Sequence, residues 1–408
     1  MADIEVAAHR YRWVIIGVLW TAYIVIFMHR LSIGPLAPFI KEEMGLSSAQ
    51  VGSLMSAVSF GYLLSMIPAG WAVDRIGVRK VLIMGELIGG ISMLGFFFVP
   101  SYNAGLAVMG ISGFGCGCIF PSTTKGVMEW FPANERATIM GLKQTGVNVG
   151  GVVSAAVLPL VAIALNWRYG FLFLAILAIL IGILTFALYR DPSRQPVSDS
   201  GDGIDRPADK KAAGQSLRHL LRSRDLWLLA WASFFLGIIE FAVMAHLVLY
   251  LTEELLYPVV TAGVILAVTQ AGGILGKPGS GILSDRLFGG GRKKVFLLWA
   301  ILTGIICLMV ALWGGSLSWA LYPVLFILGL TAIGWGGISL TLIGELSGTE
   351  LAGRAVSIVG EFIMIGFIIG PVLFGYFVDI TGSYQPSWLF CAACGAVSAV
   401  SLLFVRAK

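Results

Sequence analysis

Charged residues are scarce in this chain of 408 residues. Aspartate, glutamate, lysine and arginine together make up 12% of it, whereas about 25% is usual in a soluble domain. Hydrophobic residues make up 58%, which leaves too little polar surface to keep a folded domain in water. The composition excludes an ordinary soluble protein and indicates one that lies in a lipid bilayer.

Common enzyme motifs are missing as well. The chain contains no H-E-x-x-H, no G-x-S-x-G and no P-loop. Cys391 and Cys394 have a metal-like spacing, but there is neither a second pair nor a nearby histidine, so helix packing is the better interpretation. We therefore predict no enzymatic activity, no cofactor and no metal. A membrane-embedded enzyme and a transporter-derived sensor remain less favoured alternatives.

Twelve long apolar runs are present, and each is long enough to cross a hydrocarbon core, which takes about 20 helical residues. The runs cover 13–38, 49–72, 79–99, 102–127, 134–163, 168–189, 224–251, 259–284, 294–314, 316–345, 352–378 and 385–405. This pattern predicts an all-α membrane protein with twelve transmembrane helices. Residues 191–223 are polar and rich in charge, so they indicate a linker between bundles at 1–190 and 224–408.

Lysine and arginine are distributed unevenly between the loops. If the N-terminus is cytoplasmic, the outer loops contain only Lys41 and Arg168, and the other loop lysines and arginines fall inside. The positive-inside rule then places both termini in the cytoplasm, which predicts a multi-pass protein of the cell inner membrane. The net charge of +5 follows from this asymmetry and gives no reason to expect a nucleic-acid partner.

The two halves of the sequence repeat each other. At an offset of 211 residues, Gly70-Trp-Ala-Val-Asp74-Arg75 aligns with Gly281-Ile-Leu-Ser-Asp285-Arg286. Repeats with an even number of helices share one orientation in the membrane, so we expect two pseudo-symmetric six-helix bundles around a central path.

A family resemblance rests on these aligned motifs. The stretch from Gly70 to Lys80, with Asp74, Arg75 and Arg79, resembles the G-x-x-x-D-R-x-G-R-K signature of the major facilitator superfamily. The copy containing Gly281, Asp285 and Arg286 lies at the equivalent place in the second half. The resemblance implies the major facilitator fold. It also implies that these seven residues gate the cytoplasmic side, with glycine allowing close helix contact and aspartate accepting bonds from basic groups.

Placing an ionisable side chain inside a membrane costs free energy, so such residues in the apolar runs are first interpreted as functional. The stretch Lys277-Pro278-Gly-Ser-Gly281 resembles the monocarboxylate and oxalate transporter branches, which carry a carboxylate-binding arginine there. This implies that Lys277 contacts substrate, with Gln270 on the same helix face. The alternative is that Lys277 only pairs with an acid such as Glu361.

The second half of the first run resembles the anion:cation symporter branch. In His29-Arg30-Leu-Ser-Ile-Gly-Pro35, Arg30 matches that branch's arginine, but His29 stands where the branch has aspartate, and Cys116 stands where it has a helix-4 glutamate. Anion binding therefore carries over to Arg30, whereas the branch's proton coupling does not. A salt bridge from Arg30 to Glu240 is the alternative.

The remaining candidates follow from depth and from the repeat. Lys143 and Glu361 are equivalent at an offset of 218, which suggests an ion pair or a shared cavity, and Tyr62 and Trp335 are candidates to line the path. Proton carriers are Glu240, Glu361, His29 and His246, although packing is an alternative for either histidine.

We predict a monomeric, proton-coupled symporter of a small organic anion, a mono- or dicarboxylate. The rival within the same superfamily is a drug:proton antiporter. Antiporters there carry G-x-x-x-G-P-x-x-G-G in helix 5, whereas this chain has Gly146-Val-Asn-Val-Gly150-Gly151 without the proline. The missing proline favours the symporter.

Overall fold

The computed structural model describes residues 2–191, 220, 222–348 and 351–406. Most of the predicted linker, 191–223, lies outside the described residues. In the described part, twelve helical segments are long and apolar enough to cross a membrane, which confirms the predicted number of spans.

The first half contains seven helices, because its first span is broken in two. These are α1 (Ala2–Arg30), α2 (Ile33–Met44), α3 (Ser48–Ile76), α4 (Val78–Phe97), α5 (Tyr102–Trp130), α6 (Ala133–Ala164) and α7 (Trp167–Leu188). The helix stops at Arg30 and restarts at Ile33, where Pro35 in the new first turn needs no backbone partner for its nitrogen.

The second half is built in the same way. It contains α9 (Arg224–Leu249) with a π-helical end η1 (Tyr250–Glu254), α10 (Val259–Arg286), α11 (Arg292–Trp313), short 3-10 turns η2 (Gly314–Ser316) and η3 (Ser318–Ala320), α12 (Leu321–Ala332), α13 (Gly336–Ser347), α14 (Ala352–Thr381) and α15 (Gln385–Leu403). The tenth span is broken between α12 and α13, and Trp335 lies in that break.

Glycine allows the helices within each half to pack backbone against backbone. A Cβ atom on Gly61 of α3 would lie 1.9 Å from the carbonyl oxygen of Gly110 on α5. Its equivalent at the repeat offset, Gly272 of α10, would place a Cβ 2.1 Å from the Phe326 oxygen on α12. The repeat found in the sequence is therefore also a repeat in packing.

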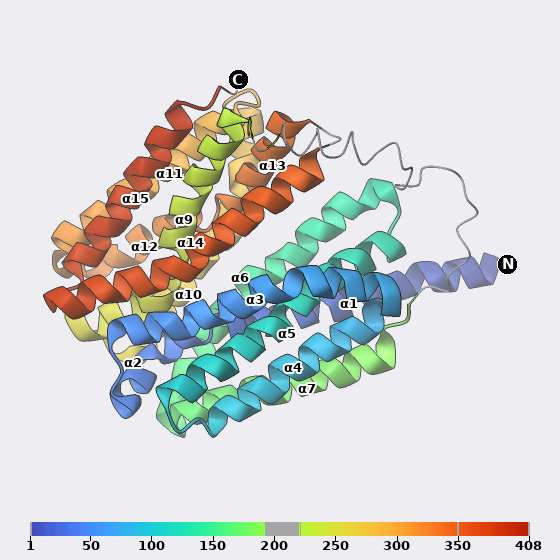
Figure 1. The fold of residues 1–408 in the computed structure, drawn as a ribbon, viewed down its shortest axis with the longest axis horizontal. Helices are drawn as coiled ribbons and strands as arrows, with labels where there is room; N and C mark the ends of the chain where they lie inside the picture. Colours follow the sequence, from blue (N-terminus) through green and yellow to red (C-terminus); the bar gives the residue numbers. More distant parts are fainter. Residues whose placement is uncertain (1, 192–219, 221, 349–350, 407–408) are drawn as a thin grey trace.

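The two halves meet at one end of the molecule and separate at the other (Figure 1). We call the end where α3 begins and α14 stops the closed end. There the Cβ position of Gly375 on α14 is 2.4 Å from the backbone of Ser48 on α3.

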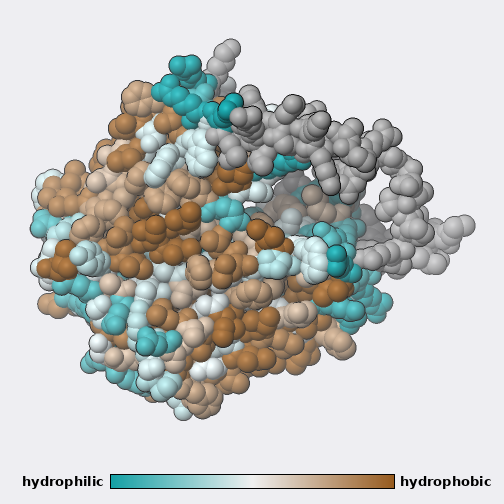
Figure 2. Space-filling view, in the orientation of Figure 1, coloured by the Kyte–Doolittle hydropathy of each residue, from teal (hydrophilic) through white to brown (hydrophobic). Residues whose placement is uncertain are grey.

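The opposite end, which carries the chain termini, is the open end. Among the described residues, Cβ positions built on Gly70, Gly141, Gly281 and Gly353, from four helices of the two halves, meet no atom within 4 Å. The surface is visibly hollowed between the halves on this side, next to the grey atoms (Figure 2). The close helix contact expected at Gly70 and Gly281 is therefore absent in this conformation, because the helices that would provide it lie apart.

Candidate functional site

Arg30 ends helix α1 at the level where the halves touch. Its guanidinium lies 4.5 Å from the ring centre of Tyr62 and 4.8 Å from that of Phe241, in the other half. Its Nη2 lies 3.8 Å from the sulfur of Met364 on α14. Aromatic faces attract a cation without neutralising it, so these contacts anchor Arg30 to both halves and leave it without an ion-pair partner among the described residues.

Lys277 of α10 crosses to the first half. Its Nζ donates a hydrogen bond of 2.6 Å to the side-chain oxygen of Asn148 on α6. Asn148 is 1% exposed, and its amide nitrogen has no hydrogen-bond partner. The Asn148 side-chain oxygen already accepts a bond from Lys277, so the group of Asn148 that is left without a partner is its N–H donor. The pair therefore presents N–H groups of both halves at one place.

Gln270 and Asn148 fit into glycine notches of the opposite half. The Cβ position of Gly151 on α6 lies 2.6 Å from the Gln270 amide nitrogen, and that of Gly273 on α10 lies 2.7 Å from the Asn148 amide nitrogen. Each helix thus carries an amide and a glycine three residues apart, and each amide occupies the partner's notch. A larger residue at either glycine would compete with an amide for this space.

Glu240 of α9 is the acid of this region. Lys277 and Arg30 are the cations that act on it electrostatically, and the Trp335 indole lies beside it without satisfactory hydrogen-bond geometry. No ion pair within 4 Å joins Arg30 to Glu240 in the described chain, so the predicted alternative of a direct salt bridge is wrong for this conformation.

Six residues from both halves thus form what we call the central cluster. They are Arg30, Asn148, Glu240, Gln270, Lys277 and Trp335. Arg30 and Trp335 both stand at breaks in their spans, and discontinuous helices are a frequent feature of transporter binding sites. Two cations and one acid at membrane depth, with unpaired N–H donors nearby, suit the binding of an anion.

Lys143 and Glu361 are not brought together, although the repeat makes them equivalent. Lys143 is 1% exposed, donates to Thr124 at 3.0 Å and lies 4.7 Å from the ring centre of Tyr23. Its hydrogen bonds and ring contacts in the described chain are all with residues of the first half. Glu361 is partly exposed on α14. The predicted ion pair is absent, because equivalent residues of two pseudo-symmetric bundles need not face each other.

The two histidines lie in helix packing. A ring nitrogen of His29 is 3.1 Å from the Leu174 oxygen on α7. In the other half, a ring nitrogen of His246 is 2.8 Å from the Pro371 oxygen, and its ring stacks on Phe374. Both side chains are fully buried, and within the described part of the chain neither ring forms a hydrogen bond or stacks with a side chain of the central cluster. This placement fits the packing alternative.

The predicted gating residues all lie at the open end. Asp74 accepts a 2.6 Å bond from Lys125 of its own half, and Arg75 lies 3.8 Å from the Trp71 ring centre. The backbone amide of Arg79 donates to Asp191 at 3.1 Å. In the second copy, Gly281, Asp285 and Arg286 are exposed. The bond between Asp74 and Lys125 thus lies within one half.

Sequence reasoning missed the rings around Arg30. Phe241 and Phe367 stack on each other at 4.0 Å, and both approach Arg30 from the second half. The only signal was that Phe241 follows Glu240, because aromatic residues are too common in membrane helices to stand out.

Similar proteins agree with this architecture. The chain is 27% identical over 97% of its length to a probable sulfoacetate transporter of Cupriavidus necator, covering 94% of that protein. It is 24% identical over 95% of its length to a hexuronate transporter of Bacillus subtilis, covering 93% of it.

Two solved structures share the fold. A bacterial homologue of the human lysosomal transporter Spinster, in an inward-facing and unoccupied conformation, superposes with a TM-score of 0.76 at 20% identity. A D-xylose-proton symporter superposes with a TM-score of 0.77 at 17% identity. Each comparison covers 97% of this chain, and 95% and 97% of the respective structures. The family profile of the Major Facilitator Superfamily matches residues 19–364. The chain is a multi-pass membrane protein and belongs to the major facilitator superfamily.

Proposed function

We propose that the protein is a secondary transporter that moves a small organic anion across the membrane by alternating access. The observation that carries this proposal is that Arg30 and Lys277, one from each half, both lie within electrostatic reach of Glu240 and each contact the opposite half. Neither cation has an ion-pair partner within 4 Å in the described chain. An anion bound between them would be held by both halves.

The names of the relatives support an anionic substrate. Sulfoacetate and hexuronate each carry a carboxylate, and both words stand in the names of proteins similar over nearly the whole chain. We propose a mono- or dicarboxylate, with Lys277 and Arg30 contacting oxyanions and with Asn148 and Gln270 bonding to the polar remainder. Tyr62, Trp335 and Lys143 complete the proposed path.

We further propose that a proton accompanies the anion, with Glu240 as its carrier. A deprotonated Glu240 offers a negative charge to the same two cations that the substrate needs. Protonation removes that competing charge, so binding of the anion and binding of the proton favour each other. Glu361 is the next candidate because it lies on a neighbouring helix, and His29 and His246 follow.

The distribution of lysine and arginine supports an orientation with both termini in the cytoplasm, in the inner membrane of the cell. The open end would then face the cytoplasm. The conformation would be inward-open, and the cycle would require the closed end to separate while the open end closes.

A thermal-shift screen of the purified protein tests the substrate class. We expect small carboxylates to raise the melting temperature, and acidic pH to strengthen that effect, whereas neutral analogues of the same size should do nothing. The active anion is then tested in proteoliposomes, where an inward proton gradient should drive accumulation and a protonophore should abolish it. Stabilisation by cationic drugs instead of anions would favour the antiporter and contradict the proposal.

A further inference from the structure

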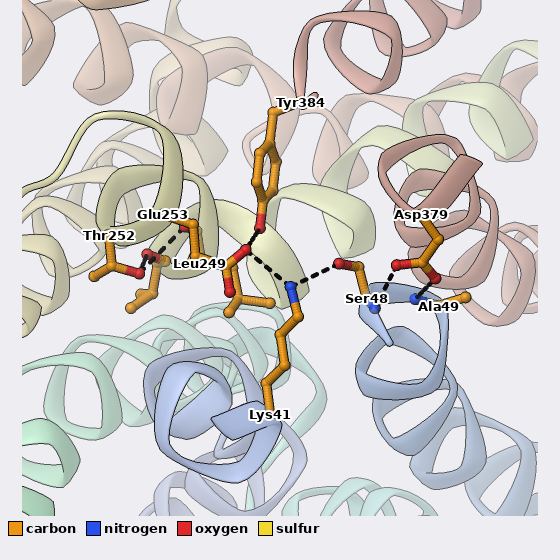
Figure 3. A network of polar contacts seen from close by, with 9 residues as sticks. Lys41, Ser48, Ala49, Leu249, Thr252, Glu253, Asp379 and Tyr384 are labelled. Atoms are coloured by element: carbon orange, nitrogen blue, oxygen red, sulfur yellow. Dashed lines mark hydrogen bonds and ion pairs between the residues drawn. The ribbon is translucent and has the colours of Figure 1, made fainter. Parts of the chain in front are cut away.

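Polar side chains of the two halves are joined at the closed end (Figure 3). Lys41 lies in the last turn of α2, Glu253 lies in η1, and Asp379 lies near the end of α14. These three charges come from three segments that are far apart in the sequence. None of them belongs to the central cluster or to the motif at the open end.

Asp379 caps a helix of the opposite half. Its two carboxylate oxygens accept bonds of 2.7 Å and 2.8 Å from the backbone amides of Ser48 and Ala49, the first residues of α3. Amides in the first turn of a helix have no partner within the helix, and the positive end of the helix dipole favours a carboxylate there. The helix also has its own capping box, formed by Ser47 and Gln50. Asp379 accepts bonds from the Ser48 and Ala49 amides, which the capping box does not use.

Lys41 forms the second connection. Its Nζ donates to Glu253 at 2.8 Å and to the Ser48 hydroxyl at 3.0 Å. The Tyr384 hydroxyl donates to the same oxygen of Glu253 at 2.7 Å. Ser48 thus touches both connections, since its amide bonds to Asp379 and its hydroxyl to Lys41. The two connections form one continuous network across the boundary between the halves.

Close packing lies directly beneath the network. The Cβ position of Gly52, one turn into α3, lies 2.3 Å from the Pro371 oxygen on α14, and the Ser56 hydroxyl donates 2.5 Å to the Ile368 oxygen. Nothing the size of a substrate can pass between α3 and α14 while these contacts exist. Passage at this end requires the network to break.

We infer that Lys41, Glu253 and Asp379 form an outer latch, which holds the closed end shut and is released in each transport cycle. Partly exposed ion pairs are individually weak, and the Lys41 and Glu253 side chains are 21% and 36% exposed. Such contacts can therefore be remade many times. The latch sets the balance between the two conformations and does not itself bind the substrate.

Accessibility of a buried position at the closed end reports the state of the latch. Ser56 is 5% exposed and faces α14, so Ser56→Cys introduces a nearly isosteric thiol between the halves. The five native cysteines are all buried, and the parent chain measures their background. A membrane-impermeant maleimide is applied to the purified protein without any substrate, so the result does not depend on the proposed function.

We expect Asp379→Asn in the Ser56→Cys background to speed labelling by about 2- to 30-fold, the range that corresponds to the loss of a helix cap. Lys41→Met should act in the same direction. The double exchange Lys41→Glu with Glu253→Lys should restore slow labelling, which a folding defect would not allow.

Glu43→Gln is the matched control. Glu43 lies at the same end and pairs with Arg168 at 2.9 Å, but both residues belong to the first half, so its loss should leave labelling unchanged. Unchanged labelling in Asp379→Asn and Lys41→Met, with normal melting curves, would overturn the latch. An equal increase in Glu43→Gln would also overturn it, since the effect would then be general to charges at this surface.

Discussion

Replacing Lys277 by alanine is the sharpest test of the central cluster. The ammonium is bonded to the Asn148 oxygen at 2.6 Å, and its remaining two N–H groups are the ones proposed to reach an anion. Truncating one partner of a buried, hydrogen-bonded charge pair costs about 2–5 kcal/mol. At about 1.4 kcal/mol for each tenfold change, the affinity for the anion should fall by about 30-fold to several thousand-fold.

Titration calorimetry with the best anion from the thermal-shift screen measures this loss. Lys277→Arg should retain binding, because the charge is kept, although the planar fork changes the preferred anion. If Lys277 served only to neutralise Glu240, removing both side chains would restore binding, since no orphaned charge would remain. Full affinity in the Lys277→Ala, Glu240→Ala double variant would therefore refute the contact with substrate. Lys277→Ala with Glu361→Ala is the matched comparison, because Glu361 is not paired with Lys277.

Three further predictions concern coupling, gating and packing. Glu240→Gln should leave anion exchange intact while abolishing proton-driven accumulation in proteoliposomes; if accumulation persists, the proton is carried elsewhere. Asp74→Asn weakens the 2.6 Å ion pair with Lys125 and should slow initial uptake in a protein that still folds. Uptake at the wild-type rate would mean that the motif has only a structural role. Gly61→Val should lower the melting temperature in detergent, because its Cβ would lie 1.9 Å from the Gly110 oxygen. Gly17→Val, whose Cβ would meet no described atom within 4 Å, should lower the melting temperature far less. Equal decreases would contradict the packing argument.

The number of spans could be predicted because the bilayer imposes one length on every apolar run. The ends were harder to predict. The first span continues from the predicted 13–38 to Met44, and the helix break inside it comes directly after Arg30. Pro35 and Pro38 marked a disturbance in this region, but a proline inside a membrane helix does not reveal whether the helix kinks or stops.

The partners of the deep charges could not be predicted, because depth and face do not specify rotation against a second bundle. Lys277 was expected to pair with Glu361 if it did not bind substrate, yet its partner is the neutral Asn148. Asn148 can lie next to Lys277 because Gly273, which has no side chain, leaves space for the Asn148 amide. A glycine three residues from a glutamine is an unremarkable pattern in a membrane helix until the facing helix repeats it.

The two ends of the molecule use their acids in opposite ways, and this difference gives a physical account of the cycle. At the open end, Asp74 bonds to Lys125 within its own half. At the closed end, Asp379 bonds across the boundary to α3. Under the proposed alternating access, we expect these roles to be exchanged: Asp379 would lose its two amides as the closed end separates, and Asp74 would gain partners across the boundary as the other end closes. Asp74 is bonded in the present conformation as well, so under this proposal at least one of the two carboxylates is bonded in each state. This limits the free-energy difference between the states that a bound substrate must overcome.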